Sequence, residues 1–265
     1  MPKTSKKSQI VRSPRVRIEF AVLITLRCNF RCSFCIVKDL LEDTELGRGP
    51  KDMDYSDFKV LINKLAKRKE KNVCMGGGEP FLHSDAALMA SYAAQKLGKT
   101  HASITTNMSL FPTDPDAAKK LLKSLGEARL NMSIDREHLR HDKSLPKRIK
   151  TAIDSAESYD DLKVIAVARN SYEARHPFPK SVSRLIPMEL KQNMDLRFDY
   201  YSKMHEHPKT EDLSITFLPN GRVFAILIGA SPNIKAMIGD WRKDPLEKFM
   251  EWRSQAQYFG LTRFN

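Results

Sequence analysis

Short apolar runs alternate with longer amphipathic stretches along the first 190 residues of the chain. The first run, RIEFAVLITL (17–26), is apolar at almost every position, which is typical of a strand that is buried on both faces. Runs of the same kind predict further strands at 71–80, 100–107, 128–135, 162–170 and 183–190. The sequence therefore predicts six strands.

Helical spacing fills the intervals between these runs. Residues 54–69 place Phe58, Leu61, Ile62 and Leu65 on one face of a helix. Further helices are predicted at 85–98, 114–126 and about 145–158. Strands that alternate with helices indicate parallel β/α units, and six units are too few for an eight-unit barrel of about 250 residues. We therefore expect an α/β fold, specifically a partial (β/α)6 barrel.

The alternation stops after residue 190. LSITFLPNGRVFAILIG (213–229) predicts a β-hairpin, because Pro219-Asn220-Gly221 is a strong turn signal between two alternating strands. A helix is expected from about Pro245 to Gln257. These patterns predict three parts: a basic leader (1–17), a barrel (18–190) and a small C-terminal extension (191–265).

The composition is that of a folded and basic protein. Lys and Arg (45) exceed Asp and Glu (32) by 13, and the sequence pI is about 9.6. Six of the positive charges lie within residues 1–17, which contain no acidic residue. A basic arm of this kind can hold phosphates, although a solvated, flexible tail is the simpler explanation.

No apolar stretch approaches the roughly 20 residues that a membrane span needs. FAVLITL (20–26) follows a basic segment, as the core of a signal peptide would. However, Glu19 precedes it and no small-residue cleavage site follows before Cys28. We therefore expect a cytoplasmic protein with no membrane partner.

Three of the four cysteines lie within eight residues, CNFRCSFC (28–35). A structural zinc site usually takes four ligands in two separated pairs, and electron-transfer iron–sulfur clusters normally take four thiolates. The fourth cysteine, Cys74, has no cysteine near it in the sequence. A cluster that is held by three thiolates leaves one iron open to an outside ligand, and an open position indicates chemistry rather than scaffolding.

The motif CxxxCxxC, formed by Cys28, Cys32 and Cys35 after the first strand, resembles that of the radical S-adenosylmethionine (radical SAM) superfamily. GGGEP (76–80), at the end of the second predicted strand, strengthens the resemblance. The resemblance implies that the three cysteines hold one [4Fe–4S] cluster and that SAM binds its fourth iron. An electron from a donor such as flavodoxin or ferredoxin would then cleave SAM, and the resulting 5′-deoxyadenosyl radical would abstract hydrogen from a substrate.

The GGE segment consists of Gly77, Gly78 and Glu79 in this chain. In the family it holds the amino group of SAM. Glycines allow a bound group to approach the backbone closely, and a glutamate supplies an anion for an ammonium group. We therefore expect these three residues to bind the cofactor.

The resemblance extends over about residues 18–190 and suggests further cofactor contacts. Phe34 occupies the apolar position that family members place against adenine. Asn107, Ser133 and Asp135 end the third and fourth predicted strands, where the family contacts the ribose and carboxylate of SAM. The alternative is that these polar residues cap helices and form turns.

Two more residues are weak catalytic candidates. His138, just after the fourth predicted strand, could contact the substrate or transfer a proton. Cys74 could donate a hydrogen atom to a radical intermediate. The alternatives are an exposed loop histidine and a small core cysteine.

The predicted hairpin and IGDWRKDPLEKF (238–249) resemble the C-terminal extension called SPASM or twitch. In that extension, the strand after the Asn-Gly turn normally runs into a cysteine that binds an auxiliary cluster. Here the strand reads RVFAILIG, and no cysteine follows Cys74. The scaffold is therefore expected without its auxiliary clusters.

The SPASM-like extension favours a peptide substrate and hence a peptide-modifying maturase. The basic arm and the high pI favour the alternative of a nucleotide or RNA substrate. A third hypothesis, from another class, is a non-catalytic iron–sulfur or zinc-binding protein.

Overall fold

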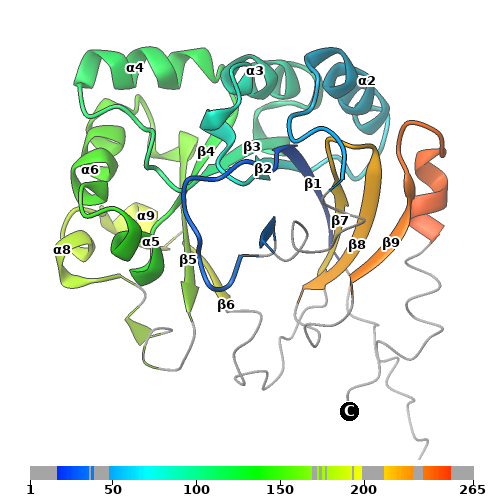
Figure 1. Cartoon of the computed structure of the whole chain (residues 1–265). Helices are drawn as coiled ribbons and strands as arrows, with labels where there is room; N and C mark the ends of the chain where they lie inside the picture. The colour runs from blue at the N-terminus through cyan, green and yellow to red at the C-terminus, as the bar shows by residue number, and fades with distance from the viewer. Residues whose placement is uncertain are drawn as a thin grey trace, which may run out of the picture.

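The protein folds around one strongly curved β-sheet (Figure 1). The computed structural model describes residues 17–35, 37–38, 48–168, 178–192, 194–198, 212–228 and 235–251, together with residues 172, 175 and 176. Within these residues the sheet has nine strands in the order β6-β5-β4-β3-β2-β1-β7-β8-β9. It forms an arch that does not close on itself, as a partial barrel requires.

Six strands of this sheet are parallel and follow the chain order: β1 (Arg17–Thr25), β2 (Val73–Gly77), β3 (Ala102–Thr106), β4 (Arg129–Ser133), β5 (Leu162–Ala168) and β6 (Asp195–Phe198). The first five lie within the predicted runs. Because parallel strands need a crossover between them, a helical segment follows each of the first five strands and leads to the next.

The outer face of the arch is covered by helices (Figure 1): α2 (Tyr55–Ala66), α3 (Ala86–Leu97), α4 (Pro115–Ser124), α6 (Leu145–Ser155), α8 (Lys180–Ser183) and α9 (Met188–Gln192). The short helix α5 (Arg136–His141) follows the carboxyl end of β4. The predicted apolar face of α2 is fully buried. The Asp114 side chain accepts a hydrogen bond from the N–H of Ala117 at the start of α4, where Pro115 is the first helical residue. The helices predicted before residue 160 are therefore confirmed.

The two faces of the strands differ in chemistry. Alternate residues that face the helices are apolar and buried, such as Val22, Met75 and Ile104. Their neighbours point to the inside of the arch and include many polar residues, among them Ser103 and Thr105. A sheet with this distribution packs its outer face and leaves its inner face available for a ligand.

The predicted strand at 183–190 is wrong. Helices α8 and α9 occupy the two ends of this segment with a turn between them, and the sixth strand begins later, at Asp195. Pro187 has no N–H to donate to a central strand. Buried Val182, Ile186 and Leu190 are spaced by four residues, which is the period of a helix rather than of a strand.

The predicted hairpin is confirmed as β7 (Asp212–Phe217) and β8 (Arg222–Ile228), which pair antiparallel, followed by β9 (Lys235–Asp240). However, β7 also pairs in parallel with β1, from Arg17↔Asp212 to Val22↔Phe217. The hairpin therefore continues the barrel sheet instead of forming a sheet of its own.

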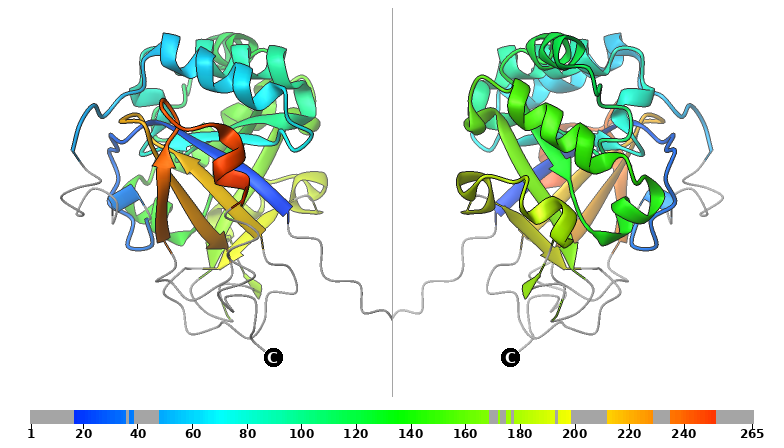
Figure 2. Two further views of the ribbon diagram at one scale, coloured as in Figure 1. Left: turned by 90° about the vertical axis from the view of Figure 1, so that its right-hand side faces the viewer. Right: turned by 90° about the vertical axis from the view of Figure 1, so that its left-hand side faces the viewer.

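The segment after β9 packs on the outside of the arch, as Figure 2 shows. Residues 246–251 are helical, and the far end of the predicted helix lies outside the described residues. Trp241 and Phe249 are buried, and the Trp241 indole N–H donates to the carbonyl of Leu218 at 3.0 Å. The Lys64 ammonium donates to the Trp241 carbonyl at 3.1 Å, which ties this segment to α2. No described helix combines the length and apolar character needed to cross a membrane.

Candidate functional site

The cysteine segment begins directly after β1, at the carboxyl end of the parallel strands (Figure 1). The end of β2 lies against it. The N–H of Gly78 donates to the Thr25 carbonyl at 2.9 Å, and the N–H of Glu79 donates to the Arg27 carbonyl at 2.7 Å. Two segments that are about fifty residues apart in the sequence are therefore joined immediately before Cys28.

The glycines of GGGE lie closer to this segment than a side chain would allow. A Cβ atom at Gly77 would lie 1.9 Å from the Thr25 carbonyl oxygen, and one at Gly78 would lie 1.9 Å from that of Arg27. By contrast, nothing lies within 4 Å of the position of a Cβ at Gly76. The close approach at Gly77 and Gly78 is therefore made by the protein's own backbone, and open space for a ligand adjoins Gly76.

The three cysteines differ in exposure: Cys28 is exposed, Cys35 is half-buried and Cys32 is buried. The Phe30 N–H donates to Cys28 Sγ at 3.3 Å. Burial raises the pKa of Cys28 and, more strongly, that of Cys32, and the negative charge of Cys35 raises both further. The three thiols therefore differ in their access to solvent within one short segment.

The predicted cluster fits this set of donors. Three thiols within eight residues, with the pKa values of Cys28 and Cys32 raised, suit a cationic centre, which holds thiolates in the deprotonated form. Within the described residues, no three His, Cys, Asp or Glu side chains converge closely enough to hold a single metal ion. Cys28, Cys32 and Cys35 are the residues that would hold a three-cysteine [4Fe–4S] cluster.

Glu79 is fully buried and bound by the chain itself. Its carboxylate accepts hydrogen bonds from the Thr106 hydroxyl (2.8 Å), the Asn107 N–H (2.8 Å) and the Phe81 N–H (3.1 Å). Burial raises its pKa to about 7, although these donors oppose the shift. Glu79 therefore links the end of β2 to the end of β3, and its predicted contact with the amino group of SAM stays a prediction.

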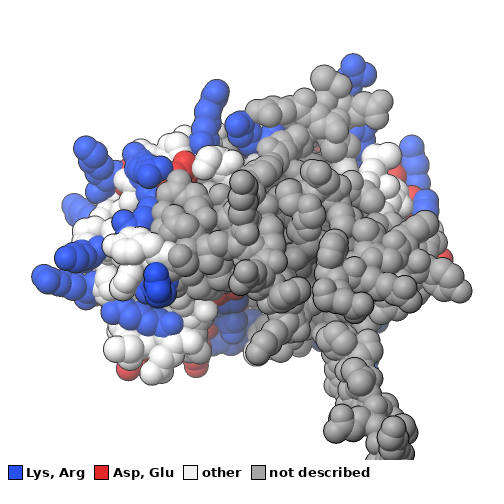
Figure 3. Space-filling model, turned by 90° about the horizontal axis from the view of Figure 1, so that it is seen from below, with Lys and Arg blue, Asp and Glu red and all other residues white. Residues whose placement is uncertain are grey.

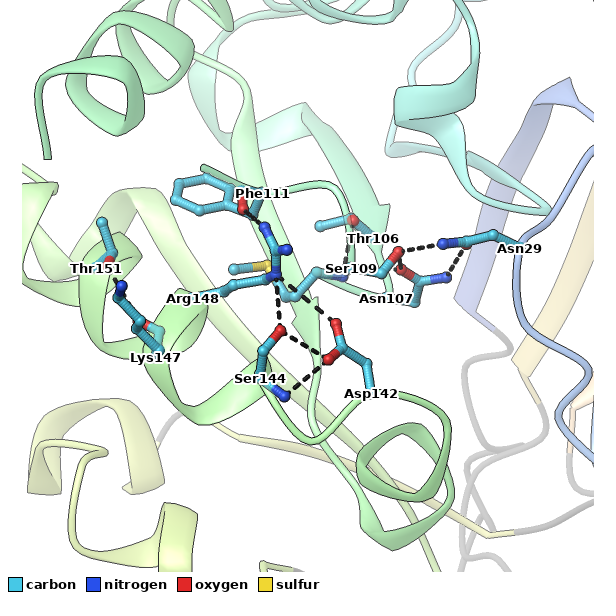
Figure 4. Close-up of polar contacts among 11 residues, drawn as sticks. Asn29, Thr106, Asn107, Ser109, Phe111, Asp142, Ser144, Lys147, Arg148 and Thr151 are labelled. Atoms are coloured by element: carbon cyan, nitrogen blue, oxygen red, sulfur yellow. Dashed lines mark hydrogen bonds and ion pairs between the residues drawn. The ribbon is translucent and has the colours of Figure 1, made fainter. Parts of the chain in front are cut away.

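Asn107 connects the end of β3 to the cysteine segment (Figure 4). Its side-chain amide donates to Asn29 Oδ1 at 3.0 Å and approaches Cys28 Sγ at 3.9 Å. The Ser109 hydroxyl donates to Asn107 Oδ1 at 2.6 Å, and Asn29 Nδ2 donates to Ser109 Oγ at 2.7 Å. The next residue, Met108, has a φ of 66°, and residues held in this region concentrate at functional sites.

A second group of contacts in Figure 4 joins α6 to the turn that follows β3. The Arg148 guanidinium donates to the Phe111 carbonyl and, at 3.3 Å, to the Ser144 hydroxyl. It also lies 3.7 Å from an Asp142 carboxylate oxygen, and Asp142 in turn accepts hydrogen bonds from Ser144. Helix α6 is thereby attached to the loop that carries Asn107.

Asp135 and His138 form a buried pair beside the cysteine segment. Asp135 Oδ1 accepts from the N–H groups of Glu137 and His138 and so caps α5, as the alternative interpretation predicted. Asp135 Oδ2 lies 2.8 Å from His138 Nδ1. The His138 ring lies 5.8 Å from that of Phe34 and 6.1 Å from that of Phe30, between ring centroids. His138 is thus buried in a helix, and the interpretation as an exposed loop residue is wrong.

The structure places all the predicted site residues at or near one end of the sheet, with Cys74 deeper inside. Ser133, half-buried, is the last residue of β4. Cys74 is not part of the packed core: it lies on the inner face, where Thr105 Oγ1 is 3.1 Å from its sulfur. Sequence reasoning missed Asn29, which could have been noticed only as a polar residue inside the cysteine motif. It also missed Asn131, because no linear motif surrounds it.

Comparisons with known proteins agree with this site. The family model described as the radical SAM superfamily matches residues 22–170. An Fe-coproporphyrin III synthase from Methanosarcina barkeri is 33% identical over 135 residues, covering 50% of this chain and 30% of that protein. A GTP 3′,8-cyclase from Campylobacter jejuni subsp. doylei is 25% identical over 200 residues, covering 72% of this chain and 58% of that protein. The chain thus spans less than two thirds of the length of these relatives.

Solved structures share the fold. The crystal structure of Streptococcus suis SuiB bound to precursor peptide SuiA has a TM-score of 0.57 at 14% identity and covers 94% of this chain and 67% of that one. Native anSMEcpe with bound AdoMet has a TM-score of 0.54 at 13% identity, covering 88% of this chain and 80% of that one. These likenesses confirm the fold and, at this identity, nothing finer.

Proposed function

This chain belongs to the radical SAM superfamily, and we propose on that premise that it is an enzyme whose Cys28, Cys32 and Cys35 hold a [4Fe–4S] cluster. The observation that carries the proposal is the joining of the cysteine segment to GGGE by the Gly78 and Glu79 hydrogen bonds. When bound, the cluster and SAM supply a carbon radical that abstracts hydrogen from a substrate. The electron would come from a small donor such as flavodoxin or ferredoxin.

The residues of the chain have separate tasks in this proposal. Gly76, in the GGGE segment that is joined to the cysteine segment, leaves open space where SAM would bind. Phe34 and His138 provide rings at the cysteine segment, and Asp135 keeps the His138 ring in place. Residues that position a reactive group and exclude water are the protein's main contribution when a cofactor carries the chemistry.

The proposed substrate is a peptide, and the proposed activity is the modification of one of its residues. The SuiB structure contains a precursor peptide and shares this fold over 94% of the chain. The C-terminal hairpin, which resembles a SPASM or twitch extension without cysteines, supports the same proposal.

A nucleotide is the second candidate, because the GTP 3′,8-cyclases are among the relatives in sequence. The name of these relatives specifies a nucleotide, GTP, as their substrate. The high pI of this chain agrees with an anionic substrate but does not select one.

The activity is tested in anaerobic solution. The purified chain is loaded with iron and sulfide, reduced with dithionite and given SAM, and 5′-deoxyadenosine is measured by chromatography. We expect about four irons per chain and product formation. Cys32→Ala should lose both. Full iron loading without product, with or without candidate substrates, would favour a non-catalytic iron–sulfur protein, and zinc in place of iron would contradict the proposal.

The substrate is tested with deuterium. Candidate peptides and GTP, each deuterated at carbon, are supplied separately to the loaded enzyme. Transfer of deuterium into 5′-deoxyadenosine identifies the substrate that loses hydrogen. Transfer from GTP and from no peptide would replace the first candidate with the second.

A further inference from the structure

Neighbouring strands place a row of polar side chains on the inner face of the arch. Thr105 of β3, Asn131 of β4 and Lys163 of β5 lie directly opposite one another in the register. Cys74 of β2 joins this row through its contact with Thr105. On the same strands, the residues that face the helices are apolar. The row is therefore a feature of the inside of the barrel.

Hydrogen bonds within the row orient the Asn131 side chain. Asn131 Nδ2 donates to Thr105 Oγ1 at 3.2 Å and lies 3.8 Å from Cys74 Sγ. Thr105 Oγ1 in turn lies 3.1 Å from the same sulfur. Because the amide nitrogen is used in this way, the amide oxygen points away from Thr105.

Asn131 Oδ1 is buried, and no hydrogen-bond partner for it exists among the described residues. The whole residue is 4% exposed. Buried polar atoms in folded proteins nearly always have a partner, so an exception requires an explanation. Thr105 and Cys74 are only half-buried, which shows that the row adjoins accessible space. An acceptor beside that space is suited to an N–H or O–H group of a ligand.

Among the described side chains, the charges of the inner face are balanced, which suits a neutral ligand group. Among inward positions of β1 to β6 with described side chains, two are basic (Arg129 and Lys163) and two are acidic (Glu19 and Asp195). Lys163 Nζ lies 3.4 Å from an Asp195 carboxylate oxygen. A nucleoside triphosphate needs an excess of cations, which these positions do not offer.

We propose that Asn131, held by Thr105, is a substrate-binding residue whose Oδ1 accepts the N–H of a neutral amide group, such as a peptide bond. This inference rests on the proposed function and makes it more specific, since it assigns the inner row to the peptide and not to a nucleotide. Asn131 is a specificity-determining residue in this assignment. The Cys74 thiol lies next to Asn131, so its rate of alkylation can report on binding to the row.

The test compares two alkylating reagents that differ in their N–H donors, with a variant that separates this difference from their difference in size. Iodoacetamide carries N–H donors, whereas N,N-dimethyl-iodoacetamide carries none. Each replaces the proton of the Cys74 thiol, with iodide as the leaving group, and peptide mass spectrometry measures the rate at Cys74 in the full, cluster-loaded chain. The preference is the rate with iodoacetamide divided by the rate with the dimethyl reagent. We expect this ratio at Cys74 to exceed the ratio for free N-acetylcysteine by about two- to tenfold, as one hydrogen bond allows.

Asn131→Leu should reduce this preference to that of N-acetylcysteine. Asn63→Leu, the same substitution at an exposed position of α2, should leave it unchanged. A preference that persists in Asn131→Leu would reflect only the size of the reagents and would overturn the proposal. So would a Cys74 that neither reagent modifies, because no ligand would then reach the row.

Protection of Cys74 distinguishes the two substrate classes. An acetylated tripeptide amide should slow alkylation by iodoacetamide more than GTP does, and stronger protection by GTP would overturn the assignment. The formation of 5′-deoxyadenosine from SAM by the unmodified enzyme is measured separately. Its absence would count against the proposed function, whereas the alkylation result is read independently of it.

Discussion

At the scale of single residues, the glycines at the end of β2 have different surroundings although they are adjacent. A Cβ atom at Gly78 would lie 1.9 Å from the Arg27 carbonyl oxygen and 2.8 Å from the Cys28 Cβ. Gly76 has open space. The same substitution should therefore disturb the cysteine segment at Gly78 and leave it unchanged at Gly76.

Gly78→Ala should displace the cysteine segment and prevent normal iron loading, since backbone atoms cannot yield to a Cβ at this distance. A loss of roughly 1–3 kcal/mol of stability should accompany it, as for other overpacked sites. Gly76→Ala should load iron normally. Iron and sulfide content after reconstitution is the measurement, and equal loading of the two variants would show that the close approach does not position the cysteines.

The Glu79 carboxyl should make stability depend on pH. Burial raises its folded-state pKa to about 7, above the ordinary value of 4.5. The folded state then keeps a proton that the unfolded state releases, so stability is greatest below pH 4.5 and falls as the pH rises to about 7. We expect this residue to contribute a decrease of roughly 1–3 kcal/mol between pH 5 and 8.

Urea unfolding of the metal-free protein at several pH values measures this effect. Glu79→Gln should remove the decrease, whereas the remaining titratable groups affect both proteins equally. If the two proteins show parallel pH profiles, the carboxyl is ionised in the folded state, and its three donors outweigh its burial.

At the scale of elements, the C-terminal segment packs against the outside of the sheet, as the helices of the barrel do. Phe249 is buried against Phe217 of β7, with ring centroids 6.2 Å apart. Arg242 forms an ion pair with Asp57 of α2 at 2.6 Å. Because β7 pairs with β1 as well, the predicted extension and the predicted barrel share one sheet and one core.

A shared core predicts one cooperative unfolding transition. Both tryptophans follow residue 240, so fluorescence reports the C-terminal part, and circular dichroism reports the whole chain. The two signals should change together in urea, and Phe249→Ala should shift both by about 3–5 kcal/mol. Val60→Ala, at a residue that is 51% exposed, should change stability by less than about 0.5 kcal/mol. Two separate transitions would instead show that the barrel and the C-terminal extension unfold as two domains.

The sequence was informative wherever one segment carries its own signal. Apolar runs revealed the first five strands, the Asn220-Gly221 turn revealed the hairpin, and the cysteine spacing revealed the centre of the site. Pro187 was the signal against a strand at 183–190. Contacts that depend on register had no such signal: the Asn131 row requires three strands to be aligned, and the pairing of β7 with β1 joins segments almost 200 residues apart.

At the scale of the whole molecule, the chain carries an excess of 13 positive charges, and six of its basic residues lie within residues 1–17. Figure 3 shows Lys and Arg side chains on both flanks of the described surface, with more on the left. Such a protein should retain RNA at low salt without sequence preference and release it steeply, by about 0.3 M salt. Filter binding of a short RNA over a salt series checks this. Retention at higher salt, together with RNA-dependent 5′-deoxyadenosine formation, would favour an RNA substrate.

The position of β1 between β2 and β7 has a consequence for the exchange of backbone amide hydrogens with solvent. From Phe20 to Val22 the strand has a hydrogen-bonded neighbour on each side, whereas β6 and β9 bound the described sheet. Amides of β1 should therefore exchange only through global unfolding, and those of β6 and β9 through local opening. The cysteine segment is thus attached to the part of the molecule that opens last, so its geometry should persist until the whole chain unfolds.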